Sequence, residues 1–180
     1  MTEHERVGSD RTRATRRVNA MHLGAFFSGL LWLTMLVTGS RAQPVELQNL
    51  NNAGILPTNL PLSDAVAVDG TLYLSGQLGV VPGTLELVPG GMEAEARQTM
   101  ENIRQILRAN DLDYEDLIKC TIMLADIDEW PAFNEVYAEM LTKPYPARSA
   151  FAASGLALNA RVEVECIAHI GSLMLSRRTR

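Results

Sequence analysis

The sequence predicts a single α+β domain in which two helices pack on one face of a mixed sheet. Three observations support this fold class. Two segments carry apolar residues at three- and four-residue spacing, which is typical of amphipathic helices. Several short segments alternate apolar and polar residues, as strands do. Their order along the chain is β-β-α-β-α-β-β, which has too few strand–helix alternations for a doubly wound sheet.

The first two predicted strands form a hairpin. Residues 65–68 and 71–75 flank the pair Asp69-Gly70. An Asp-Gly pair supplies the positive φ angles that a tight hairpin turn needs. Before the hairpin, residues 43–59 are interpreted as a linker and irregular lead-in. After it, residues 76–91 are rich in glycine and proline and are interpreted as a loop.

The two predicted helices each have one apolar face. The first covers residues 92–109, and its apolar residues are Met92, Ala96, Met100, Ile103 and Leu107. Asp128 is the expected N-cap of the second helix, with Pro131 tolerated in its first turn. The apolar stripe of that helix consists of Trp130, Phe133, Tyr137 and Met140.

Three further strands are predicted, near residues 117–125, 149–153 and 162–170. In the first of them, the side chains expected on the buried face are Ile118, Cys120, Ile122 and Leu124. In the last, Glu163 and Glu165 share one face, opposite apolar neighbours. The predicted domain spans residues 60–172, and a short basic tail, 173–180, follows it.

The first 42 residues are predicted to direct the domain out of the cytoplasm. Arginines precede an uncharged, largely apolar stretch at residues 18–40. Two interpretations stay open. In the first, a signal peptide is cleaved near Ala42, which the small residues Ser40 and Ala42 favour, and the domain is periplasmic or secreted. In the second, residues 20–38 anchor the chain, and the membrane is contacted only through this segment.

Charge argues against a nucleic-acid partner. Outside the first 42 residues the chain has 10 basic and 18 acidic residues, a formal net charge of −8. A negatively charged domain without basic stripes repels phosphate backbones. We therefore expect no nucleic-acid partner.

The two cysteines, Cys120 and Cys166, lie in apolar alternating segments and have no metal-ligand spacing. A disulfide is possible in an oxidising compartment, but two buried thiols are the favoured interpretation because cysteine packs as a small apolar residue. No His-Glu-x-x-His, phosphate-binding glycine loop or Gly-x-Ser-x-Gly elbow is present, so we expect neither a zinc enzyme nor a kinase, a dinucleotide dehydrogenase or a serine hydrolase.

A cation and two carboxylates near the C-terminus are the strongest candidates for a site. Arg148 follows the rigid Pro146 turn, and its planar guanidinium suits a carboxylate ligand. Either Glu163 or Glu165, if partly buried, would have a raised pKa and accept a proton from water. Spacing alone leaves a surface arginine and a solvated acidic face as alternatives.

Three further residues are weaker candidates. Asn134 and Tyr137 lie one helical turn apart and can present an amide and a phenol to one pocket, although core packing is an alternative for Tyr137. Ser75 ends a strand where a hydroxyl and backbone N–H groups can meet an anion, or it simply begins a loop.

Several segments together resemble one known family. Pro146-Ala147-Arg148-Ser149 and Val162-Glu163-Val164-Glu165-Cys166 resemble the C-terminal signature of the Rid (YjgF-type) family of imine and enamine deaminases. The family's entry segment and first hairpin are matched by Pro61 to Val66 and Leu72 to Gly79. The resemblance covers roughly residues 60–170.

The resemblance implies a chorismate-mutase-like subunit that forms a homotrimer with clefts between subunits. It also implies hydrolysis of 2-imino or enamino acids to 2-oxo acids and ammonia without metal or organic cofactor, so the expected ligand is a small imino or 2-oxo acid. By position, Arg148 would hold the substrate carboxylate and Glu165 would handle the attacking water. Ser75, Asn134 and Tyr137 would line the cleft.

One residue departs from the pattern. Leu62 stands where many members have a tyrosine in the cleft. A leucine donates no hydrogen bond, so it makes the substrate-binding pocket more apolar or alters the substrate range. It also leaves open a second reading, a non-catalytic domain of the same type that binds a small carboxylic acid or a protein partner.

Overall fold

The computed structural model describes residues 47–171. The predicted targeting segment, the first residues of the linker and the predicted basic tail lie outside the described residues. Between residues 47 and 171, no helix has the length and apolar character needed to cross a membrane.

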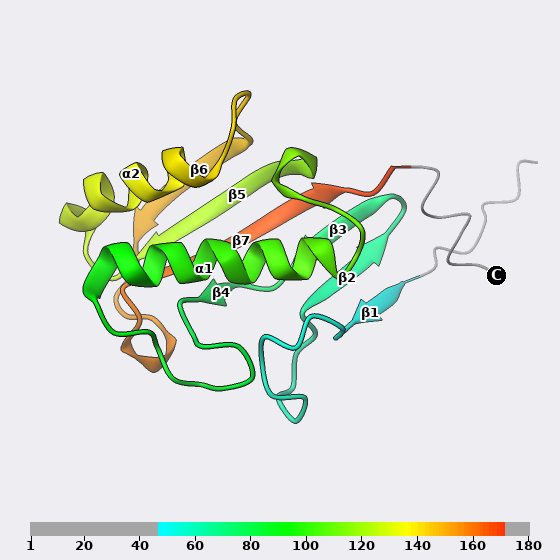
Figure 1. Cartoon of the computed structure of the whole chain (residues 1–180), viewed down its shortest axis with the longest axis horizontal. Helices are drawn as coiled ribbons and strands as arrows, with labels where there is room; N and C mark the ends of the chain where they lie inside the picture. Colours follow the sequence, from blue (N-terminus) through cyan, green and yellow to red (C-terminus); the bar gives the residue numbers. More distant parts are fainter. Residues whose placement is uncertain (1–46, 172–180) are drawn as a thin grey trace, which may run out of the picture. The chain divides into compact units, whose positions relative to one another are not determined.

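The described residues form one mixed sheet with two helices on the same face, as the sequence predicted (Figure 1). The strand order is β1-β2-β3-β7-β5-β6, with β4 paired to β7; β5 and β6 are parallel and the other pairs are antiparallel. The strands are β1 (Gln48–Leu50), β2 (Ala65–Val68), β3 (Thr71–Leu74), β4 (Gln77–Leu78), β5 (Leu117–Leu124), β6 (Ala147–Ala152) and β7 (Val162–His169). The helices are α1 (Gly91–Arg108) and α2 (Trp130–Met140), with three short 3-10 turns, η1 (Tyr114–Asp116), η2 (Ile127–Glu129) and η3 (Ala157–Asn159).

The hairpin of β2 and β3 has the predicted turn. Asp69 and Gly70 have φ angles of 46° and 77°, so both central residues are left-handed, as a type I′ turn requires. Strands β1 and β4 were not predicted, because they lie in segments interpreted as lead-in and loop. Strand β4 lies beside the first residues of β7, with Leu78 opposite Glu163.

Helix α1 buries the predicted apolar face against the sheet. It also fixes the loop after β4. The buried Asn102 side chain donates to the carbonyls of Leu78 and Val80, both at 2.9 Å. Gly79 packs so closely on the helix that a Cβ there would lie 2.7 Å from the Glu95 backbone. These contacts hold the β4–α1 loop in place.

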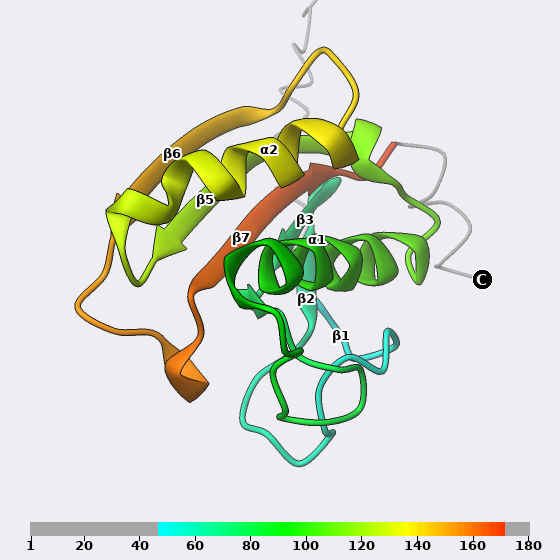
Figure 2. The same cartoon turned by 60° about the vertical axis from the view of Figure 1, so that its left-hand side comes forward.

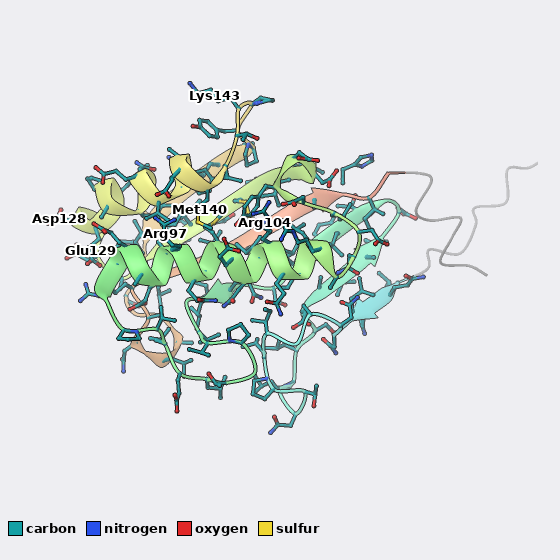
Figure 3. The ribbon with its side chains drawn as sticks, viewed as in Figure 1. Arg97, Arg104, Asp128, Glu129, Met140 and Lys143 are labelled. Carbon is teal, nitrogen blue, oxygen red and sulfur yellow. A yellow bond between two sulfur atoms is a disulfide. The ribbon has the colours of Figure 1, made fainter. Side chains whose placement is uncertain are left out.

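The N-cap predicted at Asp128 is wrong. The Asp126 carboxylate instead accepts the Asp128 N–H at 3.0 Å and begins η2, which leads directly into α2. Short polar residues compete well for such turns, and the N-cap of α2 itself is Glu129, whose side chain makes no capping hydrogen bond. The two helices are joined by paired hydrogen bonds of 3.1 and 2.7 Å from Arg97 to Glu139, and Figure 3 shows Arg97 on the side of α1 that faces α2.

The predicted burial of Ile118 is also wrong, because β5 contains a bulge. The pairing of β5 with β7 shifts between Leu117 and Lys119. One extra residue reverses the alternation, so Leu117 is buried and Ile118 is exposed. From Cys120 to Leu124 the predicted alternation holds.

The favoured interpretation of two free thiols is contradicted. Cys120 and Cys166 lie directly opposite each other on β5 and β7, with Cα atoms 4.1 Å apart, and their sulfur atoms form a disulfide. No free cysteine occurs among the described residues. The sequence could not give the pairing of strands that brings these two residues together.

Reduction of this disulfide is expected to lower the free energy of unfolding by about 2–4 kcal/mol, because the bond closes a long loop in the unfolded chain. The two cysteines are 46 residues apart in sequence. Urea unfolding with and without a thiol reductant measures the effect, and a variant carrying Cys120→Ala and Cys166→Ala should not respond to the reductant. Equal stability of the native protein with and without reductant would contradict the assignment.

Candidate functional site

Arg148 lies on the helix-bearing face of the sheet. In the parallel register Arg148 is opposite the buried Cys120, and its guanidinium donates to the Asn134 side-chain oxygen at 2.7 Å. The guanidinium carbon lies 5.0 Å from the Tyr137 ring centre and 5.7 Å from that of Trp130. Two aromatic rings and an amide therefore orient the cation and leave further N–H donors for a ligand.

Arg148, Asn134 and Tyr137 line a cavity of about 320 Å³, here called the arginine cavity. Its lining residues are Asn134, Tyr137, Ala138, Tyr145, Pro146 and Arg148. The predicted residues Arg148, Asn134 and Tyr137 are thus brought together. Trp130 and Tyr145, which contribute rings beside them, were not predicted as site residues.

Tyr137 has a hydroxyl without a partner among the described residues. The side chain is only 4% exposed, and its oxygen is buried with no hydrogen bond. Burial raises the pKa of Tyr137, and the nearby Arg148 charge only partly opposes this, so the phenol keeps its proton. An unpaired buried hydroxyl of this kind costs about 1–3 kcal/mol.

A second cavity, of about 300 Å³, lies among three loops on one side of the sheet. The loops precede β2, link β4 to α1 and link β6 to β7, and all three lie at the lower side of the ribbon in Figures 1 and 2. We call it the leucine cavity because six leucines line it: Leu56, Leu60, Leu62, Leu78, Leu85 and Leu158. Glu163 is the single ionisable residue in its lining.

Glu163 has the environment expected of a proton acceptor. Burial raises the pKa of Glu163, and the neighbouring Glu165 charge raises it further. Its carboxylate has no hydrogen bond or ion pair within the described part of the chain. The Glu163 carboxylate lies close over Gly76: a Cβ there would be 2.0 Å from one of its oxygens, so a larger residue would displace the end of this side chain.

Glu165, the residue indicated by the resemblance, lies in a different environment. It shares the face of β7 with Glu163, opposite Thr121, but it is exposed and lines neither cavity. The role of Glu165 in handling the attacking water stays a prediction. The partly buried carboxylate with a raised pKa, which the sequence left open between the two, is Glu163.

Ser75 and Leu62 both belong to the structure around the leucine cavity. The Ser75 hydroxyl donates to the Ser63 carbonyl at 2.6 Å, and its backbone N–H donates to Asp64 at 3.0 Å. Ser75 therefore anchors the loop that carries Leu62, and Leu62 lines the cavity itself. The adjacent Gln77 is buried with its side-chain oxygen unpaired, a feature that the sequence did not indicate.

A single chain does not bring Arg148 and the two glutamates together. Glu163 pairs with Met123, which pairs with Phe151, three residues beyond Arg148 on an edge strand. Arg148 contacts helix α2 on one face of the sheet, while Glu163 and Glu165 point from the other face. No group of three or more His, Cys, Asp or Glu side chains between residues 47 and 171 could hold a metal ion.

Glu163→Gln is expected to stabilise the protein at pH 7–8. A carboxyl whose pKa is raised on folding binds its proton more tightly in the native state, so its ionised form lowers stability above that pKa. The penalty is absent below the unfolded pKa of about 4.3. Urea unfolding should therefore show a gain at pH 8 and none at about pH 3.5. The exposed loop variant Glu86→Gln is the control, and an equal gain at both pH values would contradict the prediction.

Comparison with known proteins identifies a matching family model, related sequences and related structures. Residues 55–170 match a family model described as Endoribonuclease L-PSP. The goat (Capra hircus) 2-iminobutanoate/2-iminopropanoate deaminase is 45% identical over 113 residues, which cover 63% of this chain and 82% of the goat protein. The crystal structure of RidA from the Antarctic bacterium Psychrobacter sp. PAMC 21119 aligns with a TM-score of 0.64 at 36% identity, over 68% of this chain and 99% of that one. E. coli TdcF, solved with bound serine, aligns with a TM-score of 0.62 at 28% identity, over 68% of this chain and 98% of that one.

Proposed function

Because the chain belongs to the Rid (YjgF-type) family, whose model is described as Endoribonuclease L-PSP, we propose that it hydrolyses 2-imino acids, or their enamine tautomers, to 2-oxo acids and ammonia. The observation that carries the proposal is the arginine cavity. There the Arg148 guanidinium, oriented by Asn134, lines an open space together with Tyr137 and Tyr145. The acidic domain favours this reaction over the ribonuclease activity in the family's description, since a net negative charge repels RNA.

Arg148 would bind the substrate carboxylate. A guanidinium grips a carboxylate through two parallel hydrogen bonds, and the Asn134 contact orients the fork before the ligand arrives. Binding of the carboxylate holds the adjacent C=N carbon in one position. Because this carbon is already electrophilic, positioning is the main contribution that the reaction needs.

Glu163 would handle the attacking water. The carboxylate takes a proton from water as the water oxygen bonds to the iminium carbon, and a carbinolamine forms. The protonated Glu163 returns that proton to nitrogen. The C–N bond then breaks with release of ammonia, and the Glu163 carboxylate accepts the hydroxyl proton as the new C=O bond forms. The raised pKa of Glu163 suits a group that both accepts and returns a proton.

A complete site would form between two copies of the chain. The arginine cavity and the leucine cavity lie apart in one chain, so the substrate would lie between Arg148 of one copy and Glu163 of another. The uncovered face of the sheet supports self-association, because Tyr73 and Phe151 are exposed there beside the half-buried Met123 and Ile167. We propose the homotrimer and the chorismate-mutase-like subunit that the resemblance implied.

We also propose that the domain works outside the cytoplasm, exported or tethered by its N-terminal segment. Two observations support this: arginines followed by an apolar stretch in the first 42 residues, and the disulfide of the domain. No metal or organic cofactor takes part in the proposed reaction.

The test is an imine assay on the purified protein. An amino-acid oxidase generates the imine in place, and semicarbazide competes for it. The protein is expected to reduce trapped imine and to speed 2-oxo acid release. Leu62 favours a second candidate, a carboxylic-acid binding domain without turnover, because it removes a hydrogen-bond donor from the pocket. Saturable binding of a 2-oxo acid with no effect on any imine would select that candidate.

A further inference from the structure

Leu158 has a backbone conformation that leucine seldom adopts. Its φ and ψ angles are 58° and 15°, in the left-handed region, where a leucine side chain is strained. The next residue, Asn159, shares this conformation, which asparagine tolerates. Burial in the core does not explain the leucine, since 44% of its surface is exposed. The feature that accounts for an apolar side chain at this position is the leucine cavity, which it lines.

The exposed leucines of the domain gather at this cavity. Four leucines are strongly exposed within residues 47–171, and three of them, Leu62, Leu85 and Leu158, line the leucine cavity. They come from three separate loops. Convergence of exposed apolar side chains from distant segments on one hollow indicates a binding surface for an apolar group.

The loops that carry these leucines are held in place. The Arg161 N–H donates to Glu95 of α1 at 2.8 Å, and the Arg161 guanidinium pairs with Glu129. Ser75 holds the loop of Leu62, as described above. The apolar surface is therefore present before any ligand binds, which reduces the entropy lost on binding.

The size of the cavity exceeds what a small side chain would fill. Its volume is about 300 Å³, whereas a methyl group displaces about as much space as one water, roughly 30 Å³. An isobutyl, thioether or benzyl group would displace several waters from leucine surfaces. Each additional buried carbon contributes binding that a methyl group lacks.

Glu163 connects the cavity to the reaction. In a 2-imino acid the side chain is bonded directly to the carbon that water attacks. If the Glu163 carboxylate handles that water, the side chain on the same carbon extends among the leucines that surround Glu163. We propose, on the basis of the proposed function, that the leucine cavity binds the substrate side chain and selects imines of large apolar amino acids such as leucine, methionine and phenylalanine over those of alanine.

The experiment compares imines that the oxidase generates from leucine and from alanine. We expect kcat/KM to be about tenfold or more higher for the leucine imine. Leu158→Asn is expected to reduce this ratio by about tenfold, because a polar amide replaces apolar surface. The same variant should unfold at an equal or higher temperature, since asparagine tolerates the left-handed backbone. Ile127→Asn is the matched control, because Ile127 is 43% exposed, lines neither cavity and should leave the ratio unchanged.

A binding measurement separates this inference from the proposed function. Calorimetric titration compares 4-methyl-2-oxopentanoate with pyruvate, the products from leucine and alanine. Preferential binding of the former by about tenfold or more, weakened by Leu158→Asn, supports the inference even if no imine is hydrolysed, in which case the proposed function alone fails. Hydrolysis of both imines with equal kcat/KM, or equal effects of Leu158→Asn on both, supports the proposed function and overturns the inference.

Discussion

Arg148→Ala is expected to lower imine hydrolysis by about a hundredfold or more, equivalent to roughly 3 kcal/mol of lost interaction with the substrate carboxylate. The variant removes both the charge and the planar fork that Asn134 orients. It should still fold, because Arg148 is an exposed residue and does not belong to the buried core. Arg148→Lys should recover only part of the rate, since an ammonium cannot form the paired hydrogen bonds.

Arg97→Ala is the control for this experiment. Arg97 also makes a close side-chain contact with a residue of α2, but its pair with Glu139 is exposed to solvent and Arg97 lines neither cavity. An exposed pair of this kind contributes about 1 kcal/mol or less, so the variant should lose little stability and no activity. Arg148→Ala with a rate within twofold of the native protein would exclude Arg148 as the carboxylate ligand.

Glu163→Gln is expected to lower the rate by about 10²–10⁴, the range that removal of a positioned proton acceptor produces. Glu165→Gln makes the same chemical change two residues away on the same face of β7, and it is expected to cost less than about tenfold because this side chain is exposed and lines neither cavity. The pair therefore controls for charge and strand position. A collapse of activity in Glu165→Gln with a normal rate in Glu163→Gln would restore the role that the resemblance gave to Glu165.

Much of the fold was predictable because its main elements carry clear periodicity. The apolar face of α1, the hairpin turn at Asp69-Gly70 and the alternation of β7 each follow from a local pattern of side chains. Strand β4 has only two residues and depends on pairing with β7, so no local pattern indicates it. The bulge after Leu117 is likewise fixed by pairing, and it reversed the expected exposure of Ile118.

The disulfide, like the bulge, could not be predicted from a local pattern of side chains. Both cysteines sit at buried positions of alternating strands, which suits free thiols and a disulfide equally well. What distinguishes the two states is the register between β5 and β7, which places Cys120 opposite Cys166. Register between strands 46 residues apart in sequence is a tertiary property, set by the packing of the whole sheet.

The grouping of side chains around Arg148 was predictable from the sequence, whereas the different environments of Glu163 and Glu165 were not. Arg148, Asn134 and Tyr137 meet as expected, because one turn of α2 presents two side chains to the neighbouring edge strand. The difference in burial between Glu163 and Glu165 could not come from alternation, which gives both the same face. It depends on the loops around Gly76 and Leu158, which cover the first residues of β7 and leave Glu165 exposed.

The central claim is that Arg148 of one copy and Glu163 of another complete one site, and mixed assemblies test it most directly. Arg148→Ala and Glu163→Gln are each expected to be inactive when purified alone. Co-expressed in equal amounts, they should form assemblies in which some sites receive an intact arginine from one copy and an intact glutamate from its neighbour. Random assortment predicts recovery of about one quarter of the native activity. Activity no higher than that of the two variants measured separately, in assemblies shown to contain both chains, would contradict the account.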